Sequence, residues 1–273
     1  MLLSRTTASV LLVLLSSSDA LSLRAIPRKQ PAATPGAALA PRPGSAHLNS
    51  VLALKGGSID FATQVAPVLG ATIANAMFAS GFPEVLQKRK EGALGDFNPV
   101  PMPIIFGNCL GWLIYSFLTK NPYVAAANVP GLLLGSWYVM TTLRIAGKED
   151  ARKIENVFMA MMTVHVVAGT ACAFFLPDGK AMAGLYGLVN NAILLLYYGA
   201  PLSTIGKVLK EKSAASIYFP TVAVNGLNGC FWSSYALAIK DWYLFVPNAI
   251  GATLAGIQAL LCIFFSGKKT ATA

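Results

Sequence analysis

Residues 108–131, NCLGWLIYSFLTKNPYVAAANVPG, correspond to residues 228–251, NGCFWSSYALAIKDWYLFVPNAIG, at an offset of 120 positions. Seven of the 24 aligned positions are identical without a gap: Asn108 and Asn228, Trp112 and Trp232, Tyr115 and Tyr235, Lys120 and Lys240, Tyr123 and Tyr243, Asn128 and Asn248, Gly131 and Gly251. A fixed offset of this kind indicates an internal duplication. The place where the two halves meet is therefore a candidate ligand site.

The composition around this repeat is typical of an integral membrane protein. The chain is 55% hydrophobic and 12% charged, with a mean hydropathy of +0.59. Its apolar residues lie in blocks of roughly 20, the length of a helix that crosses a bilayer. Backbone groups in lipid must be satisfied within the segment, which favours helices. We therefore predict an all-α membrane protein with spans at about 60–82, 99–118, 122–143, 157–176, 181–206, 217–239 and 242–265.

The net charge of +10 is unevenly distributed among the connections. Those after the first, third and fifth spans, and the C-terminal tail, are rich in Lys and Arg, whereas the alternate connections are short and nearly neutral. Basic connections stay in the cytosol. The pattern predicts a mature N-terminus outside and a C-terminus in the cytosol, and it explains the basic charge without nucleic-acid binding.

Residues 1–57 differ from the rest of the chain. Residues 1–20 resemble a secretory signal, with Arg5, a short apolar run and the small residues Ser18 and Ala20. Residues 21–57 carry basic residues and prolines and resemble a transit segment. Two interpretations stay open: a two-part plastid address or an uncleaved tail. The membrane is accordingly the plasma membrane or a plastid envelope.

The repeat unit is a group of three helices. We predict a first unit at 58–143, a linker helix at 144–180, a second unit at 181–265 and a cytosolic tail at 266–273. The single linker crossing makes the two units parallel, giving a 3+1+3 architecture with a pseudo-two-fold axis along the membrane normal.

Ordered motifs in the second half resemble the SWEET sugar transporters of the wider PQ-loop group. The resemblance rests on Ala200-Pro201-Leu202-Ser203, Asn228-Gly229, Trp232, Tyr235, Asp241, Pro247-Asn248-Ala249-Ile250-Gly251 and Gln258. The first half is a weaker match. The resemblance implies a sugar substrate, a lipid bilayer as the setting, homo-oligomers of a number that the sequence does not fix, and no cofactor.

Two pairs of residues at equivalent positions are the strongest site candidates. The pseudo-two-fold axis would bring Asn128 to face Asn248, and an uncharged amide can bind adjacent sugar hydroxyls. The alternative for each Asn is an interhelical hydrogen bond that only holds the bundle together. Trp112 and Trp232 could stack on a sugar ring, or serve as packing or interfacial residues. In the resembled family the matching tryptophans and asparagines line the sugar site.

Asn108 and Asn228 lie one turn before the tryptophans and are further candidates.

Prolines form a second set of candidates. Pro83, Pro101, Pro201 and Pro220 are expected to interrupt spans one, two, five and six and to kink them. In the resembled family a proline in each of these helices acts as a hinge. Here the usual first-span and sixth-span positions hold Gly81 and Tyr218, with Pro83 and Pro220 two residues on. The alternative is that the kinks are only structural.

Residue types that ion-coupled transport requires are missing from the spans. No Asp, Glu, Lys or Arg lies deep in a predicted span, and His165 is the only titratable candidate. We therefore expect uniport down a gradient. A metal site or an enzyme is not expected, since no His cluster, paired carboxylates or Ser/His/Asp set falls within the spans. A retinal protein is not expected either, because it would need a Lys in the last span. A different PQ-loop carrier of small solutes is the remaining alternative.

Overall fold

The computed structural model describes residues 60–265. The expected targeting extension, 1–57, and the tail, 266–273, lie outside the described residues. Within them the chain forms η2 (Phe61–Val65), α3 (Ala66–Ser80), α4 (Phe82–Glu91), α5 (Pro101–Thr119), α6 (Pro122–Ile145), α7 (Lys148–Phe175), α8 (Gly179–Glu211), α9 (Phe219–Ala238) and α10 (Trp242–Phe265). With η2, α3 and α4 as one broken helix, this order confirms the expected seven membrane helices.

Six of the seven helices are long and apolar enough to cross a membrane. The exception, α9, has 20 residues but a lower hydropathy. Its polar side chains are the reason, among them Asn225, Asn228, Ser233 and Ser234. In α9, the counterpart of α5, Asn228 and Ser233 are half-buried, whereas Asn225 and Ser234 are exposed.

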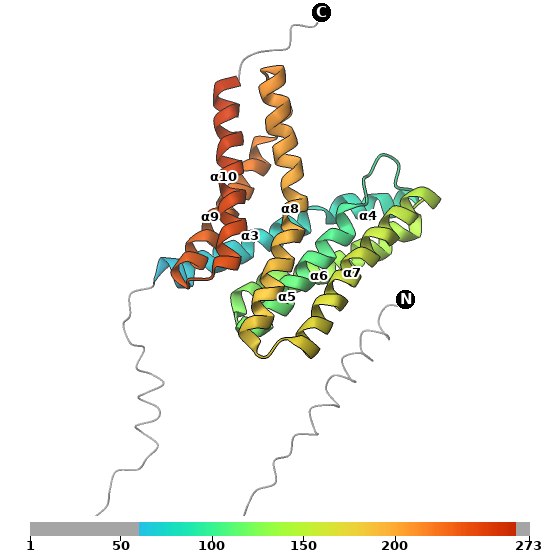
Figure 1. Cartoon of the computed structure of the whole chain (residues 1–273). Helices are drawn as coiled ribbons and strands as arrows, with labels where there is room; N and C mark the ends of the chain where they lie inside the picture. Colours follow the sequence, from blue (N-terminus) through green and yellow to red (C-terminus); the bar gives the residue numbers. More distant parts are fainter. Residues whose placement is uncertain (1–59, 266–273) are drawn as a thin grey trace, which may run out of the picture. The chain divides into compact units, whose positions relative to one another are not determined.

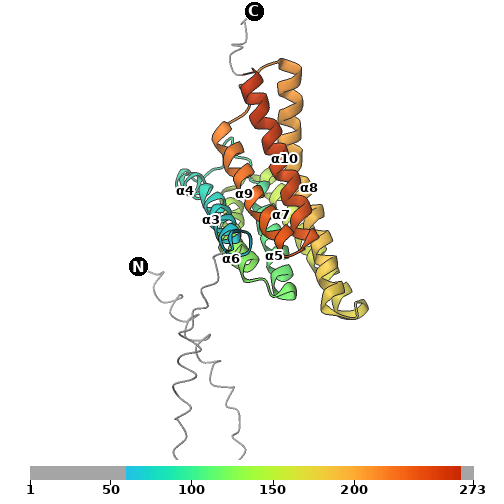
Figure 2. The ribbon, with the colours of Figure 1, turned by 90° about the vertical axis from the view of Figure 1, so that its left-hand side faces the viewer.

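The helix contacts repeat in the two halves (Figures 1 and 2). In the first half α6 packs against both α3 and α5, and in the second α10 packs against both α8 and α9. The halves touch through α3 with α9 and through α5 with α8. Exchanging α3 with α8, α5 with α9 and α6 with α10 maps each of these contacts onto another. The pairing is that of two parallel three-helix bundles related by a pseudo-two-fold axis.

The turns that start α6 and α10 repeat as well. Lys120 and Lys240 end the preceding helices in the left-handed region, with φ of 54° and 58°, a common way to stop a helix. The next residue caps the new helix: Asn121 Oδ1 accepts from Val124 N (3.2 Å) and Asp241 Oδ1 from Leu244 N (3.0 Å). The two Lys positions of the sequence repeat therefore mark the same structural turn.

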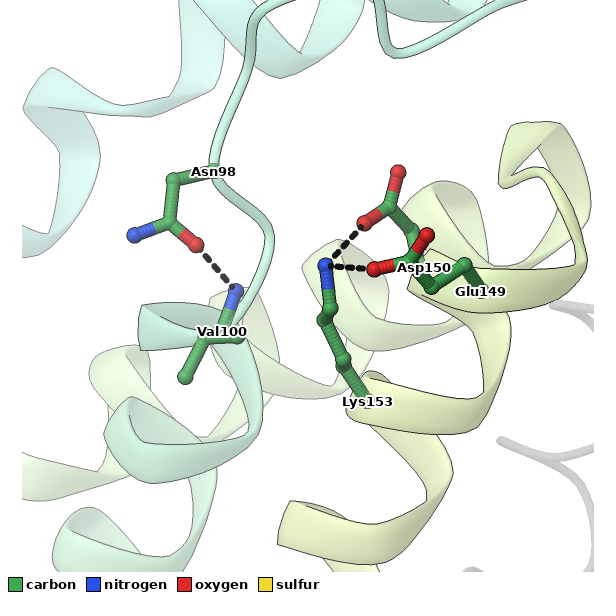
Figure 3. Close-up of polar contacts among 5 residues, drawn as sticks. All are labelled: Asn98, Val100, Glu149, Asp150 and Lys153. Carbon is green, nitrogen blue, oxygen red and sulfur yellow. Dashed lines mark hydrogen bonds and ion pairs between the residues drawn. The ribbon is translucent and has the colours of Figure 1, made fainter.

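Helix α7 starts at Lys148, nine residues before the expected span. Lys153 Nζ lies 2.9 Å from Glu149 Oε1 and 3.2 Å from Asp150 Oδ1, one turn away (Figure 3). These hydrogen bonds raise the pKa of Lys153 above its ordinary value. The acids also suit the positive end of the helix dipole. The extra turns are thus a polar extension of the apolar span.

The expectation that four prolines interrupt spans is wrong for two of them. Pro101 is the first residue of α5 and Pro220 the second residue of α9. At the start of a helix the missing proline N–H costs no hydrogen bond, so neither breaks its helix. Pro83 follows the break between α3 and α4 at Gly81, and Pro201 lies inside α8.

Another proline inside a helix explains a contact within the first bundle. Pro130 lies within α6 and has no N–H to donate to the carbonyl of Ala126. Asn75 of α3 donates to that carbonyl instead, at 3.2 Å. The proline therefore opens an acceptor through which α3 is held against α6.

The close approach of α9 to α10 requires a glycine. A Cβ atom on Gly229 would lie 2.9 Å from the backbone oxygen of Asn248 and 3.0 Å from the backbone nitrogen of Ala252. Backbone atoms cannot rotate away as a side chain can, so a larger residue must push the two helices apart.

We expect Gly229→Val to destabilise the protein by about 1–3 kcal/mol, the usual cost of overpacking. The measurement is the midpoint of thermal unfolding of the purified protein in detergent. Gly256→Val is the matched control, because a Cβ atom there would meet nothing within 4 Å. Equal midpoints for the two variants would contradict the contact.

Candidate functional site

A cavity of about 570 Å³ lies between the two bundles. All six residues singled out from the repeat line it: Asn108, Trp112, Asn128, Asn228, Trp232 and Asn248. We call these six residues the Asn–Trp belt. Residues from both halves and from sequence positions 120 apart are thus brought to one space.

Asn128 and Asn248 have the same local geometry. The Nδ2 of Asn128 donates to the Val124 carbonyl and that of Asn248 to the Leu244 carbonyl, each at 2.8 Å. Both acceptors lie one turn back on the same helix, so each bond holds the side chain against its own helix. An amide has two N–H donors and an acceptor oxygen. Each side chain can therefore offer a donor and an acceptor to a ligand in the cavity.

The other two belt asparagines differ from each other. Asn228 Nδ2 donates to the Gly70 carbonyl at 2.9 Å and so ties α9 to α3 across the bundles. Asn108 is buried, and its Oδ1 has no hydrogen-bond partner among the described residues. Buried polar atoms are nearly always paired. The Asn228 amide is therefore hydrogen-bonded within the protein, whereas the Oδ1 of Asn108 remains free to accept a hydrogen bond from a ligand.

The two belt tryptophans are each 5% exposed and are supported by tyrosines. Trp112 packs edge-on against Tyr115, with ring centroids 5.4 Å apart, and Trp232 against Tyr235 at 6.0 Å. Trp232 also lies directly on α3, because a Cβ atom on Gly70 would be 2.9 Å from the indole Nε1. These contacts hold the two indole rings in place at the wall of the cavity.

Beyond the tryptophans the two bundles are joined by a layer of aromatic residues. Tyr115 of α5 donates to Asp241 Oδ1, before α10, at 2.8 Å. Tyr115 also packs against Tyr243 (centroids 6.5 Å apart), and Tyr123 packs against Tyr235 (5.5 Å). The two ring pairs are exchanged by the repeat symmetry. We call these four tyrosines and Asp241 the closing layer, since they bridge the bundles at the end that carries Lys120 and Lys240.

The cavity extends in the opposite direction. Its lining passes Pro201 and Thr204 of α8 and reaches Ser216 and Ile217, in the connection between α8 and α9. That connection follows Lys207, Lys210 and Lys212, on the basic end of the molecule. None of the closing-layer residues lines the cavity, whereas at the basic end its lining includes the exposed Ser216 and Tyr218.

The cavity wall carries no formal charge. No Asp, Glu, Lys, Arg or His among residues 60–265 lines it. His165 lies elsewhere: it is 5% exposed, its Nε2 lies 2.8 Å from the Gly107 carbonyl oxygen, and its ring stacks on Tyr186. The cavity therefore suits a neutral, polar ligand.

Sequence reasoning missed several polar residues of the wall, namely Tyr197, Tyr198, Thr204, Asn225 and Gln258. Asn225 could have been found, because it lies three residues before Asn228 and shares its helix face. Gln258 was noted for the family resemblance but was not proposed as a site residue. The tyrosines and Thr204 resemble ordinary membrane-helix residues and give no such signal.

Comparison with known proteins gives consistent matches. The family described as "Sugar efflux transporter for intercellular exchange" matches twice, at residues 64–149 and 185–270. The bidirectional sugar transporter SWEET1 of Arabidopsis thaliana is 28% identical over 72% of this chain and 81% of its own. The sugar transporter SWEET1 of Caenorhabditis elegans is 26% identical over 75% and 66%.

A solved structure of a eukaryotic SWEET transporter has a similar fold, with a TM-score of 0.67 and 22% identity, covering 75% of this chain and 96% of that one. The two family matches each cover one three-helix bundle and together extend over most of the chain. The chain therefore belongs to the SWEET family of sugar transporters.

Proposed function

We propose that this multi-pass membrane protein is a bidirectional, facilitative transporter of mono- or disaccharides. The observation that carries the proposal is the uncharged Asn–Trp belt, to which each repeat contributes two asparagines and one tryptophan. The belt surrounds a cavity that is closed at one end by the closing layer and open at the other. Family membership and the relatives named as sugar transporters support it. Transport of this kind changes no covalent bond, so no enzymatic step is assigned to the chain.

The belt has the two kinds of contact that a sugar requires. Amides of Asn128 and Asn248 would bind hydroxyl groups, and the free Oδ1 of Asn108 would accept a hydrogen bond from a further hydroxyl. Trp112 and Trp232 would cover the apolar faces of the ring. A few placed polar groups among apolar walls are the usual design of a small-molecule site.

Alternating access follows from the two ends of the cavity. With the closing layer intact, the ligand exchanges at the basic end. Parting of the Tyr115–Asp241 bond, together with approach of the bundles at the basic end, would open the other side. Pro201, inside α8, and Pro83, after the break at Gly81, are the prolines placed to act as hinges.

The uncharged cavity favours passive transport. A proton- or cation-coupled carrier usually has an ionisable group on its pathway. The wall formed by residues 60–265 has no Asp, Glu, Lys, Arg or His side chain. Sugar would therefore move down its own gradient in either direction.

We place the basic end in the cytosol by the positive-inside rule. The proposal also includes a division of the membrane domain into units at 58–143, 144–180 and 181–265, and a homo-oligomeric assembly. The N-terminus of the membrane domain would then lie outside, and the state described here would be open to the cytosol.

Asn248→Ala is expected to lower sugar flux at least about tenfold, because it removes the hydrogen bonds that its amide offers to the ligand. Asn128→Ala should have the same effect by symmetry. The measurement is uptake of labelled glucose into liposomes that contain the full-length variant.

Thr253→Ala is the matched control for this experiment. Thr253 also bonds to the carbonyl one turn back on α10, at 2.8 Å from Ala249 O, but it does not line the cavity. Its flux should equal that of the unmodified protein. Normal flux in both Asn variants would refute their place in the site.

Tyr115→Phe keeps the ring but removes the bond to Asp241, so it should loosen the closing layer. A cysteine introduced at cavity residue Ala127 should then react several-fold faster with a membrane-impermeant maleimide added from the outer side. Tyr123→Phe, in the same layer, is the control and should have a smaller effect. An unchanged rate in Tyr115→Phe would contradict the closing role.

A further inference from the structure

The two bundles differ at a pair of equivalent buried positions near the basic end. Tyr138 of α6 and Gln258 of α10 lie 120 positions apart, in the halves of their bundles nearer the basic end. Both are buried, at 0% and 8% exposure. The aromatic side chain in one bundle thus corresponds to a shorter, flexible amide in the other.

In the first bundle Tyr138 fills the space between the helices. Its hydroxyl donates to the Phe78 carbonyl of α3 at 2.7 Å. Its ring belongs to a core cluster with Val85, Met102, Val139 and Ile154. Near the basic end, the space between the helices of the first bundle is therefore filled by this cluster, and we call Tyr138 the plug.

In the second bundle the corresponding space belongs to the cavity. Phe78 of α3, which lies against Gly131 one turn past Asn128, also lines the cavity on this side of the belt. Most of the wall there comes from three helices of the second bundle, including Thr204 of α8, Asn225 of α9, and Leu254 and Gln258 of α10. We call these four residues the inner groove. Gln258 follows Asn248 by ten residues, about 15 Å along the helix at 1.5 Å per residue. This distance is longer than a single sugar ring.

The groove has the donors and acceptors that a sugar ring needs. The amides of Asn225 and Gln258 each have two N–H donors and an acceptor oxygen. Thr204 Oγ1 donates to the Ala200 carbonyl at 3.0 Å, and its oxygen can still accept. Leu254 gives an apolar surface between them. Such a combination fits the hydroxyl groups and the apolar face of a hexose.

We infer that the inner groove is a second sugar subsite, which holds the second ring of a disaccharide whose first ring lies in the Asn–Trp belt. The inference rests on the proposed sugar transport and adds to it a subsite that only the second repeat supplies. The cavity of about 570 Å³ extends over both places. The plug at Tyr138 explains why the first repeat offers no counterpart.

The test is competition between labelled glucose and unlabelled maltose or glucose for the purified full-length protein at equilibrium. Gln258→Tyr copies the plug of the first bundle into the groove, and Gln258→Ala removes the amide but leaves the groove open. The dissociation constant of maltose, relative to that of glucose, should rise about tenfold in Gln258→Tyr and by a smaller factor in Gln258→Ala. Ile263→Tyr, at a site on α10 that is 71% exposed, should leave the ratio unchanged.

An unchanged ratio in either folded variant of Gln258 would overturn the second subsite. So would failure of maltose to compete with glucose in the unmodified protein. Neither outcome would affect the proposed function, since glucose binding would still be present. Absence of glucose binding and flux in the unmodified protein would instead refute the proposed function itself.

Discussion

The hydrogen bond from Tyr115 to Asp241 is the contact on which the account depends. It crosses from the first repeat to the second, and it lies where the ring pairs of the closing layer meet. Asp241 also caps α10 through Leu244 N, so one carboxylate both starts a helix and joins the bundles. Because this end is held and the exposed lining residues lie at the other, we infer that the cavity communicates with one side only, as a carrier at one stage of its cycle requires.

Symmetry explains the position of the site, and departures from symmetry explain its shape. The repeat brings four asparagines and two tryptophans together, but the four amides do not have equal roles: Asn228 is bonded to Gly70, whereas Asn108 keeps a free acceptor. Tyr138 and Gln258 extend this difference toward the basic end. The ligand space is therefore deeper in the second bundle.

The sequence was sufficient to predict the helices, and the six residues that it singled out line one cavity. In a membrane span a Trp or an Asn is exceptional, so its repetition 120 positions on is informative. Helix starts were less predictable: Pro101 and Pro220 are the first and second residues of their helices, and α7 is extended by Lys153 and its acidic partners. The inner groove could not be predicted, because it depends on whether one residue fills the space between three helices.

The most direct test of the central claim is the time course of labelled glucose entering liposomes that contain the full-length protein, under an imposed proton gradient and with a protonophore. An uncharged, passive site predicts that internal glucose rises faster than in empty liposomes and stops at the external concentration, at the same rate in both conditions. Accumulation above the external concentration, or uptake no faster than in empty liposomes, would contradict the account.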